Sequence, residues 1–194
     1  MPRRRAQTGA SAAAVDPEIA VALDAFIQQK LPAVQAAATA SGVKDLEEAT
    51  GTVAAAFRML RDALAATGRV AKPKDQDWAK IFAPVVELGS KANKACDNRS
   101  EWFQSRKAVA EAVNIVALVT QPGPAGHIKN VLETMDFHCV KALQRKHEAE
   151  VIWVRALKDA IKGLEPWCME NCKMGLTWKA NGEDPVQYFA AQPL

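Results

Sequence analysis

Apolar residues recur along the chain at intervals of three and four, which is the period of an amphipathic α-helix. The first such stripe follows Asp16-Pro17-Glu18, a typical helix start with an acidic N-cap and proline at the first helical position. Its apolar positions are Ile19, Leu23, Phe26 and Ile27. Because proline breaks helices and disfavours the helical conformation of the preceding residue, Pro32 predicts an interruption after Leu31, with a short second helix over residues 33–40.

Two more stripes occupy the middle of the chain. The first predicts a helix over residues 44–66 that Thr67-Gly68 ends, with apolar positions Leu46, Ala49, Val53, Ala56, Phe57, Leu60 and Leu64. A polar connection over residues 69–76 leads to the next helix, and either Asp75 or Asp77 fits its N-cap. That helix carries Trp78, Ile81, Phe82, Val85, Val86 and Leu88, and Pro84 predicts a local bend in it.

The segment 102–119 becomes apolar around most of its circumference, which predicts a helix at the centre of the fold. After it, residues 120–127 (TQPGPAGH) predict a sharp reversal, because proline stops the helix and glycine permits a tight turn. A sixth helix follows up to residue 146. A last one runs from residue 151 to residue 174 with a bend at Pro166, and residues 183–194 are expected to form a loose strap.

No segment shows the alternating β-branched pattern of a strand, so the sequence predicts an all-α antiparallel bundle of about six helices. Residues 1–15 are interpreted as a flexible N-terminal arm, 16–182 as the helical domain and 183–194 as a tail. If the helices simply alternate in direction, the loops 69–76, 121–127 and 175–182 meet at one end of the bundle. The loops 41–46, 96–102 and 144–150 then meet at the other end.

Composition narrows the function classes. The 194 residues suit one domain, and the absence of a run of eighteen apolar residues predicts no membrane insertion. The net charge of +3 is interspersed along the chain, whereas a nucleic-acid binder concentrates its basic residues on one face. The four cysteines follow no disulfide pattern and are interpreted as reduced thiols of a cytosolic protein. The basic start, residues 1–5, fits a flexible arm better than a transit peptide.

Nothing in the sequence forms a catalytic constellation, so we predict no enzyme, no cofactor and no metal. The histidines are interpreted as surface or half-buried side chains: His127, His138 and His147. His138 cannot readily activate Cys139, because neighbours on a helix point about 100° apart. Cys168 and Cys172 share a helical face, but a structural zinc site needs four ligands, and the second pair would have to come from His138 and Cys139 on another helix. Two cysteines packed as small apolar side chains are the preferred interpretation. An interaction module is therefore the preferred class.

Several landmarks together resemble one known family. They are Ile81-Phe82-Ala83-Pro84-Val85 ahead of Asn98-Arg99-Ser100, the apolar helix that leads into Gln121-Pro122-Gly123-Pro124, and Trp153-Val154-Arg155-Ala156-Leu157 ahead of Gly175-Leu176-Thr177-Trp178. In order and spacing they are similar to the N-terminal helical folded domain of cyclase-associated proteins, over roughly residues 16–182. No single motif is specific; their combination is.

The resemblance implies a non-enzymatic, cytoplasmic and cytoskeletal role. It implies binding to actin and cofilin, faster loss of subunits from filament pointed ends and monomer turnover. It also implies the alternative of a signalling scaffold that links adenylyl cyclase to the cytoskeleton, and a possible homodimer. The family usually begins with a heptad segment, which residues 1–15 lack, and continues into further domains. Cyclase binding and assembly are therefore uncertain, and the sequence leaves open whether the chain is a piece of a longer protein.

The family's tip loops are thought to contact actin or cofilin, and the matching positions here are Asn98, Arg99, Pro122, Gly123, Pro124, Thr177 and Trp178. Basic residues near one end would speed encounter with acidic actin, and the lysines named on that ground are Lys72, Lys74 and Lys179, with Pro73 beside the first two. Lys129 is added because it lies near the Pro-Gly-Pro turn. Each position has a plainer interpretation. Pro122-Gly123-Pro124 is either a helix connection or an exposed knob. Trp178 is either a cap on the bundle or an interaction anchor. Arg99 is either a helix-end charge or a specific contact.

Overall fold

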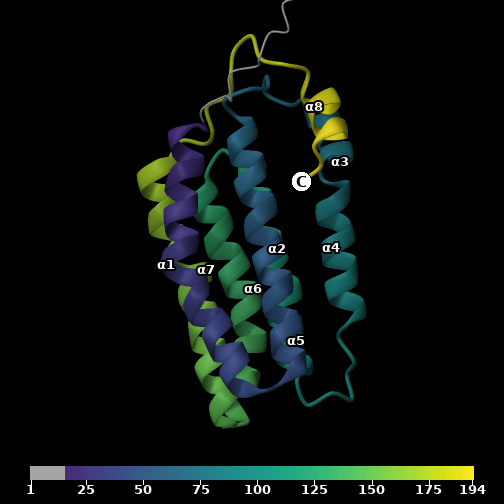
Figure 1. The fold of residues 1–194 in the computed structure, drawn as a ribbon, viewed down its shortest axis with the longest axis vertical. Helices are drawn as coiled ribbons and strands as arrows, with labels where there is room; N and C mark the ends of the chain where they lie inside the picture. The colour runs from purple at the N-terminus through teal and green to yellow at the C-terminus, as the bar shows by residue number, and fades with distance from the viewer. Residues whose placement is uncertain (1–15) are drawn as a thin grey trace, which may run out of the picture.

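Helices make up nearly all regular structure in residues 16–194, the part of the chain that the computed structural model describes. The elements in order are α1 (Glu18–Ser41), α2 (Lys44–Ala66), the 3-10 helix η1 (Asp75–Asp77), α3 (Trp78–Ile81), α4 (Ala83–Lys94), α5 (Phe103–Ala112), the 3-10 helix η2 (Val113–Thr120), α6 (Pro124–Gln144), α7 (Glu148–Asn171) and α8 (Pro185–Ala191). The long helices lie side by side and the chain reverses between them (Figure 1). The all-α prediction is confirmed. The expected count of about six becomes eight α-helices and two 3-10 helices within these residues.

The first helix corrects the prediction at Pro32, because α1 continues through this residue to Ser41. A proline inside a helix removes one backbone hydrogen bond, here to the carbonyl of Gln28. Leu31 and Val34 on either side of it are buried, and Pro32 itself lies on the exposed face, where water can solvate the freed carbonyl. Packing of the apolar face therefore outweighs the missing bond.

The bend predicted at Pro84 is present, whereas the predicted N-caps differ from those in the structure. Pro84 lies in the first turn of α4, and the chain bends at Phe82 between α3 and α4, which confirms the expected bend. Neither aspartate caps α3 with its side chain. The Asp77 carboxylate instead accepts the backbone N–H of Lys74 (3.2 Å) across η1. At the start of α1, Pro17 takes the N-cap position, and the Asp16 carboxylate forms an ion pair with Arg61.

The predicted regular helix over residues 102–119 is α-helical only from Phe103 to Ala112, and eight residues of 3-10 helix follow. Runs of 3-10 helix longer than three or four residues are uncommon. The burial pattern explains this one, since the less buried positions recur at every third residue: Asn114, Ala117 and Thr120. Three residues per turn align these positions on one edge and bury Val113, Ile115, Val116, Leu118 and Val119. The higher rise per residue also lengthens the segment by about 4 Å relative to an α-helix.

The C-terminal segment corrects the expected loose strap, because residues 185–191 form α8. The Asp184 carboxylate accepts the backbone N–H of Gln187 (2.8 Å), and Pro185 takes a first-turn position, which together give a well-formed helix start. α7 passes through Pro166 and ends at Asn171, slightly earlier than expected. The division into domains at residues 15 and 182 stays a prediction.

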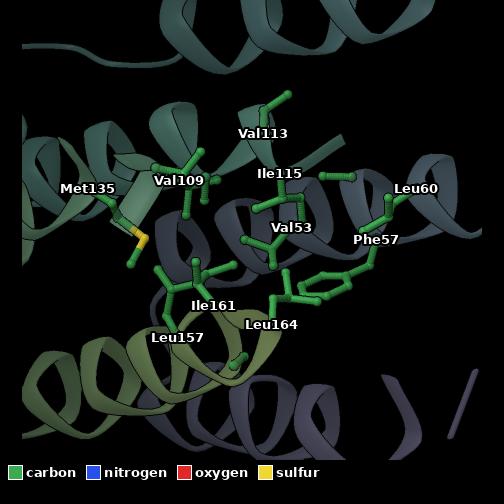
Figure 2. Packing of buried hydrophobic residues seen from close by; sticks show 14 of the residues in the cluster. Val53, Phe57, Leu60, Val109, Val113, Ile115, Met135, Leu157, Ile161 and Leu164 are labelled. Carbon is green, nitrogen blue, oxygen red and sulfur yellow. The ribbon is translucent and has the colours of Figure 1, made fainter. Parts of the chain in front are cut away.

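The main core joins side chains from α1, α2, α4, α5, η2, α6 and α7. Figure 2 shows members of it from α2, α5, η2, α6 and α7 at close range. The largest fully buried side chain of this core is Trp153, whose indole N–H donates to Thr50 Oγ1 (2.8 Å), which in turn donates to the Leu46 carbonyl (2.7 Å). A second, smaller cluster at one end contains Ala66, Val70, Ile81 and Phe189. None of the helices in residues 16–194 is long and apolar enough to cross a membrane.

Candidate interaction site at one end of the bundle

Backbone hydrogen bonds join the turn after α2 to the segment before α8. The Lys179 N–H donates to the Thr67 carbonyl (3.1 Å), the Glu183 N–H to the Arg69 carbonyl (2.9 Å), and the Ala71 N–H to the Glu183 carbonyl (3.0 Å). The two segments approach so closely that a Cβ on Gly182 would lie 2.3 Å from the Val70 carbonyl carbon. Only glycine fits there, so Gly182 is a requirement of this junction.

The Pro-Gly-Pro reversal joins the same end. Gly175 has a φ of +90°, and a Cβ on it would lie 3.5 Å from the Gln121 carbonyl oxygen, in contact with the reversal. The His127 Nε2–H donates to the Asn114 carbonyl (2.8 Å) and ties the first turn of α6 to η2. The loops 69–76, 121–127 and 175–182 therefore meet, as counting chain reversals predicts (Figure 1). We call this end, with its three loops, the tip.

Aromatic rings close the tip. The Trp178 ring meets the Trp78 ring edge-on at 5.9 Å between centroids, and Trp78 meets Phe82 at 5.3 Å. Trp178 is half-buried and packs on the small cluster around Val70 and Ile81. Trp178 therefore covers the end of the bundle and keeps an accessible surface, and its role as an interaction anchor stays a prediction. Its partner Trp78 comes from a different segment, and no feature of the sequence indicates that pairing.

The prolines of the tip differ in exposure, which corrects the expected knob. Pro124 is buried at the first position of α6, and Pro73 is buried as well. Pro122 and Gly123 are exposed. The surface of the reversal is thus formed by Pro122 and Gly123, while Pro124 and Pro73 position the loops from below.

Positive charge at the tip has no internal partner. Lys72, Lys129 and Lys179 are exposed, and none of them forms an ion pair with another residue in the range 16–194. Thr177 is exposed beside them. Unpaired cations next to an exposed turn and a half-buried tryptophan suit an acidic protein surface.

Asn98 and Arg99 are not brought to the tip; they lie in the loop between α4 and α5 at the other end. Arg99 bonds back to Asp97, with its backbone N–H at 2.9 Å and its Nε–H at 3.2 Å from Asp97 Oδ1. Arginines near this end are also paired: Arg106 reaches Asp45 (3.0 Å) and Glu48 (2.7 Å). The hydrogen bond from Arg106 lowers the pKa of the Asp45 carboxyl. The charges of Arg99 and Arg106 near this end are therefore paired with carboxylates of the same chain.

A buried carboxyl near the same end was missed by sequence reasoning. Glu150, in the first turn of α7, is fully buried; its Oε1 accepts the Ser105 hydroxyl (2.6 Å) and its Oε2 lies 3.1 Å from Arg145 Nη1. Burial raises the pKa of this carboxyl, and the Ser105 hydrogen bond partly opposes the rise. The stretch shortly before it, residues 145–148, is charged, which is typical of a solvated loop, so no local signal reveals the burial of Glu150.

The thiols and imidazoles give no catalytic arrangement. Burial raises the pKa of the Cys139 thiol to about 12, which disfavours the reactive thiolate. The neighbouring Cys172 and burial both raise the pKa of Cys168. The His138 Nδ1 lies 2.8 Å from Gln104 Oε1, and burial lowers its pKa. In the described part of the chain, no three His, Cys, Asp or Glu side chains are placed to hold a metal ion.

Comparisons relate the sequence to one family. The family described as CAP, N-terminal domain, matches residues 23–176. The adenylyl cyclase-associated protein of Dictyostelium discoideum is 23% identical over 119 residues, which cover 58% of this chain and 26% of that protein. The chain thus spans about a quarter of that relative's length. The family match stops at residue 176, just before Trp178, Lys179 and α8.

Two solved structures share the fold. A crystal structure of the N-terminal domain of CAP, which indicates variable oligomerisation of that protein, has a TM-score of 0.76 at 19% identity and covers 89% of this chain and 96% of its own. The N-terminal domain of the Dictyostelium discoideum adenylyl cyclase-associated protein has a TM-score of 0.75 at 19% identity, covering 85% of this chain and 97% of its own. Most of that domain therefore has a counterpart here.

Proposed function

This chain belongs to the CAP N-terminal domain family, and we propose that it binds actin through the tip and, with cofilin, promotes loss of subunits from filament pointed ends. Family membership supports a regulatory, non-catalytic role in the actin cytoskeleton. The finer claim depends on one observation. Three loops converge so that the exposed Pro122 turn, Trp178 and several unpaired lysines share one end of the bundle.

The chemistry of the tip supports an acidic partner. A half-buried tryptophan offers apolar area that is already held in place, and such residues are enriched at interaction hot spots. Exposed cations around it raise the association rate with a negatively charged surface, and their effect weakens as salt is added. Backbone hydrogen bonds hold the loops, so little conformational freedom is lost on binding.

Asn98 and Arg99 stay in the proposal as a separate contact, since the loop between α4 and α5 that carries them lies at the opposite end (Figure 1). A protein that engages actin and cofilin together needs two surfaces, and this proposal assigns them to the two ends of the bundle. The alternative, a scaffold for adenylyl cyclase, is favoured by the name of the Dictyostelium relative, and no feature of residues 16–194 points to it. Self-association stays a prediction for this chain.

Imaging of single actin filaments tests the proposal. Shortening at pointed ends is measured with cofilin and with wild-type chain or the Lys72→Glu/Lys179→Glu double variant. Each reversed contact is expected to cost about 1 kcal/mol, so the double variant should need at least about tenfold more protein for the same acceleration.

The matched control is Lys162→Glu, an exposed, unpaired lysine on the side of α7. It changes net charge in the same direction away from the tip and should stay close to wild type. Equal potency of the tip variant and the wild type would reject the tip as the actin surface. No acceleration by the wild-type chain would reject the actin proposal itself. Recovery of adenylyl cyclase without actin in a pull-down would favour the scaffold.

A further inference from the structure

α8 covers a small apolar surface of the bundle, which we call the groove. Val70 and Ile81 are buried in this surface. Trp78 and Phe82 are partly exposed and pack against the same cluster. α8 packs against α3 there, beside the tip (Figure 1). We propose that this groove is a receptor site for a short amphipathic helix of a partner protein, and that α8 is an intramolecular occupant which such a helix displaces.

α8 makes few anchoring contacts. Among its residues, only Pro185 and Phe189 are buried, and they are four positions apart on one helical face. Tyr188 and, after the helix, Leu194 pack partly buried against the same cluster. Two anchors at this spacing are typical of a helix that lies in a hydrophobic groove. The chemistry of the partner follows from the occupant: an acidic N-cap, a proline at the first position and an aromatic residue four positions after the proline.

The opposite flank of α8 is poorly packed. Tyr188 and Gln192 line a polar cavity of about 240 Å³ together with Arg61, Asp62 and Arg69. A helix of seven residues has little stability of its own, because helix formation needs a costly nucleus. α8 therefore belongs among the elements that open locally far more often than the bundle unfolds.

The chain before α8 is fixed independently. Glu183 is held by two backbone hydrogen bonds to residues 69 and 71, and Gly182 is packed against Val70. The helix can therefore leave the groove by a hinge at Asp184 while the tip loops keep their arrangement. This inference does not depend on actin binding, because the groove and its occupant lie within the chain.

A labelled peptide tests the groove directly. The probe is a fluorescein-labelled synthetic peptide with the sequence of residues 182–194, which includes Leu194, and its fluorescence anisotropy is measured on addition of the full chain. In the wild type, the tethered α8 outcompetes the peptide. Phe189→Ala removes the buried anchor and leaves every groove residue in place, so the peptide should bind this variant at least about tenfold more tightly than the wild type.

A second variant is needed because the cavity that Phe189→Ala leaves can itself disturb the groove. Asp184→Ala removes only the N-cap and should raise peptide binding about fivefold. Gln187→Ala, on the exposed face of α8, is the control and should bind no better than the wild type. A peptide with alanine in place of the phenylalanine should bind none of the chains.

The outcomes decide the proposal. Peptide affinity for Phe189→Ala and Asp184→Ala that equals the wild-type affinity overturns it, as does equal binding of the alanine peptide. Hydrogen exchange gives an independent measurement on the wild-type chain, at the amides of Tyr188 and Gln192, which bond within α8. Exchange as slow as that of the bundle core would contradict an occupant that can be displaced; exchange at least a hundredfold faster supports it.

Discussion

Gly182→Ala should disconnect the tip while the bundle stays folded. The new Cβ would lie 2.3 Å from the Val70 carbonyl carbon and 2.4 Å from the Ala71 nitrogen, both backbone atoms that cannot rotate away. The two segments must separate, and the three hydrogen bonds between them are lost. At about 1 kcal/mol for each bond, the local opening free energy should fall by about 3 kcal/mol.

The assay is native-state hydrogen exchange with a stability measurement beside it. The amides of Ala71, Lys179 and Glu183 should exchange about a hundredfold faster in the variant, because 1.4 kcal/mol corresponds to a factor of ten. Amides in the main core should keep wild-type rates. The control is Gly51→Ala, at an exposed position inside α2 with open space around the new Cβ, which should stabilise the chain by about 0.5–1 kcal/mol.

Two results would refute this reasoning. Unchanged exchange at the three junction amides would show that the segments tolerate a side chain and that the close approach is not required. Loss of the whole fold would show that the tip and the bundle are one cooperative unit. If the junction opens as expected, the variant should also lose acceleration of pointed-end shortening, whereas Gly51→Ala should keep it.

Three further predictions concern the bundle itself. Burial raises the pKa of Glu150 above its ordinary 4.5, so the contribution of this carboxyl to stability is largest at low pH and is lost as pH rises through the folded-state pKa. Chemical denaturation across pH 4–8 should therefore show Glu150→Gln gaining stability relative to the wild type as pH rises. A difference in stability that does not change with pH would contradict this. Trp153→Phe removes the hydrogen bond to Thr50 and opens a cavity, so urea unfolding should show a loss of about 2–3 kcal/mol, and a loss under 0.5 kcal/mol would be evidence against a tightly packed site. In η2, Val116→Ala should cost about 1–2 kcal/mol and Ala117→Ser less than about 0.5 kcal/mol, whereas equal costs would argue against the three-residue period.

Periodicity was enough to predict the long helices, and it failed where two rules competed. The apolar stripe of residues 44–66 predicted the bounds of α2 correctly, because every apolar position of that stripe, from Leu46 to Leu64, is buried in the core. Pro32 was overrated as a helix breaker, since burial on both sides of it compensates for one missing hydrogen bond. The η2 segment was missed because an apolar run looks alike at three and at 3.6 residues per turn. Its signal was present in Asn114 and Thr120, which are polar and separated by two full turns of three.

The site could be predicted in outline and not in detail. Counting chain reversals placed three loops at one end, which needs no knowledge of contacts. The exposure of each proline could not be predicted, because Pro122 and Pro124 are equivalent in the sequence and differ only in which one begins α6. Pairs such as Trp78 with Trp178, or Ser105 with Glu150, join residues far apart in the chain and carry no local signal. α8 was underestimated because its stability depends on Phe189 packing against α3.

Hydrogen exchange of the chain with and without saturating actin monomers tests the central claim most directly. The account predicts slower exchange at residues 71–72, at Gln121 and Gly123, and at residues 177–179, with the middle of α6 and α7 unchanged. Protection confined to the sides of the bundle, or no protection while actin is bound, would contradict the tip as the actin-binding surface.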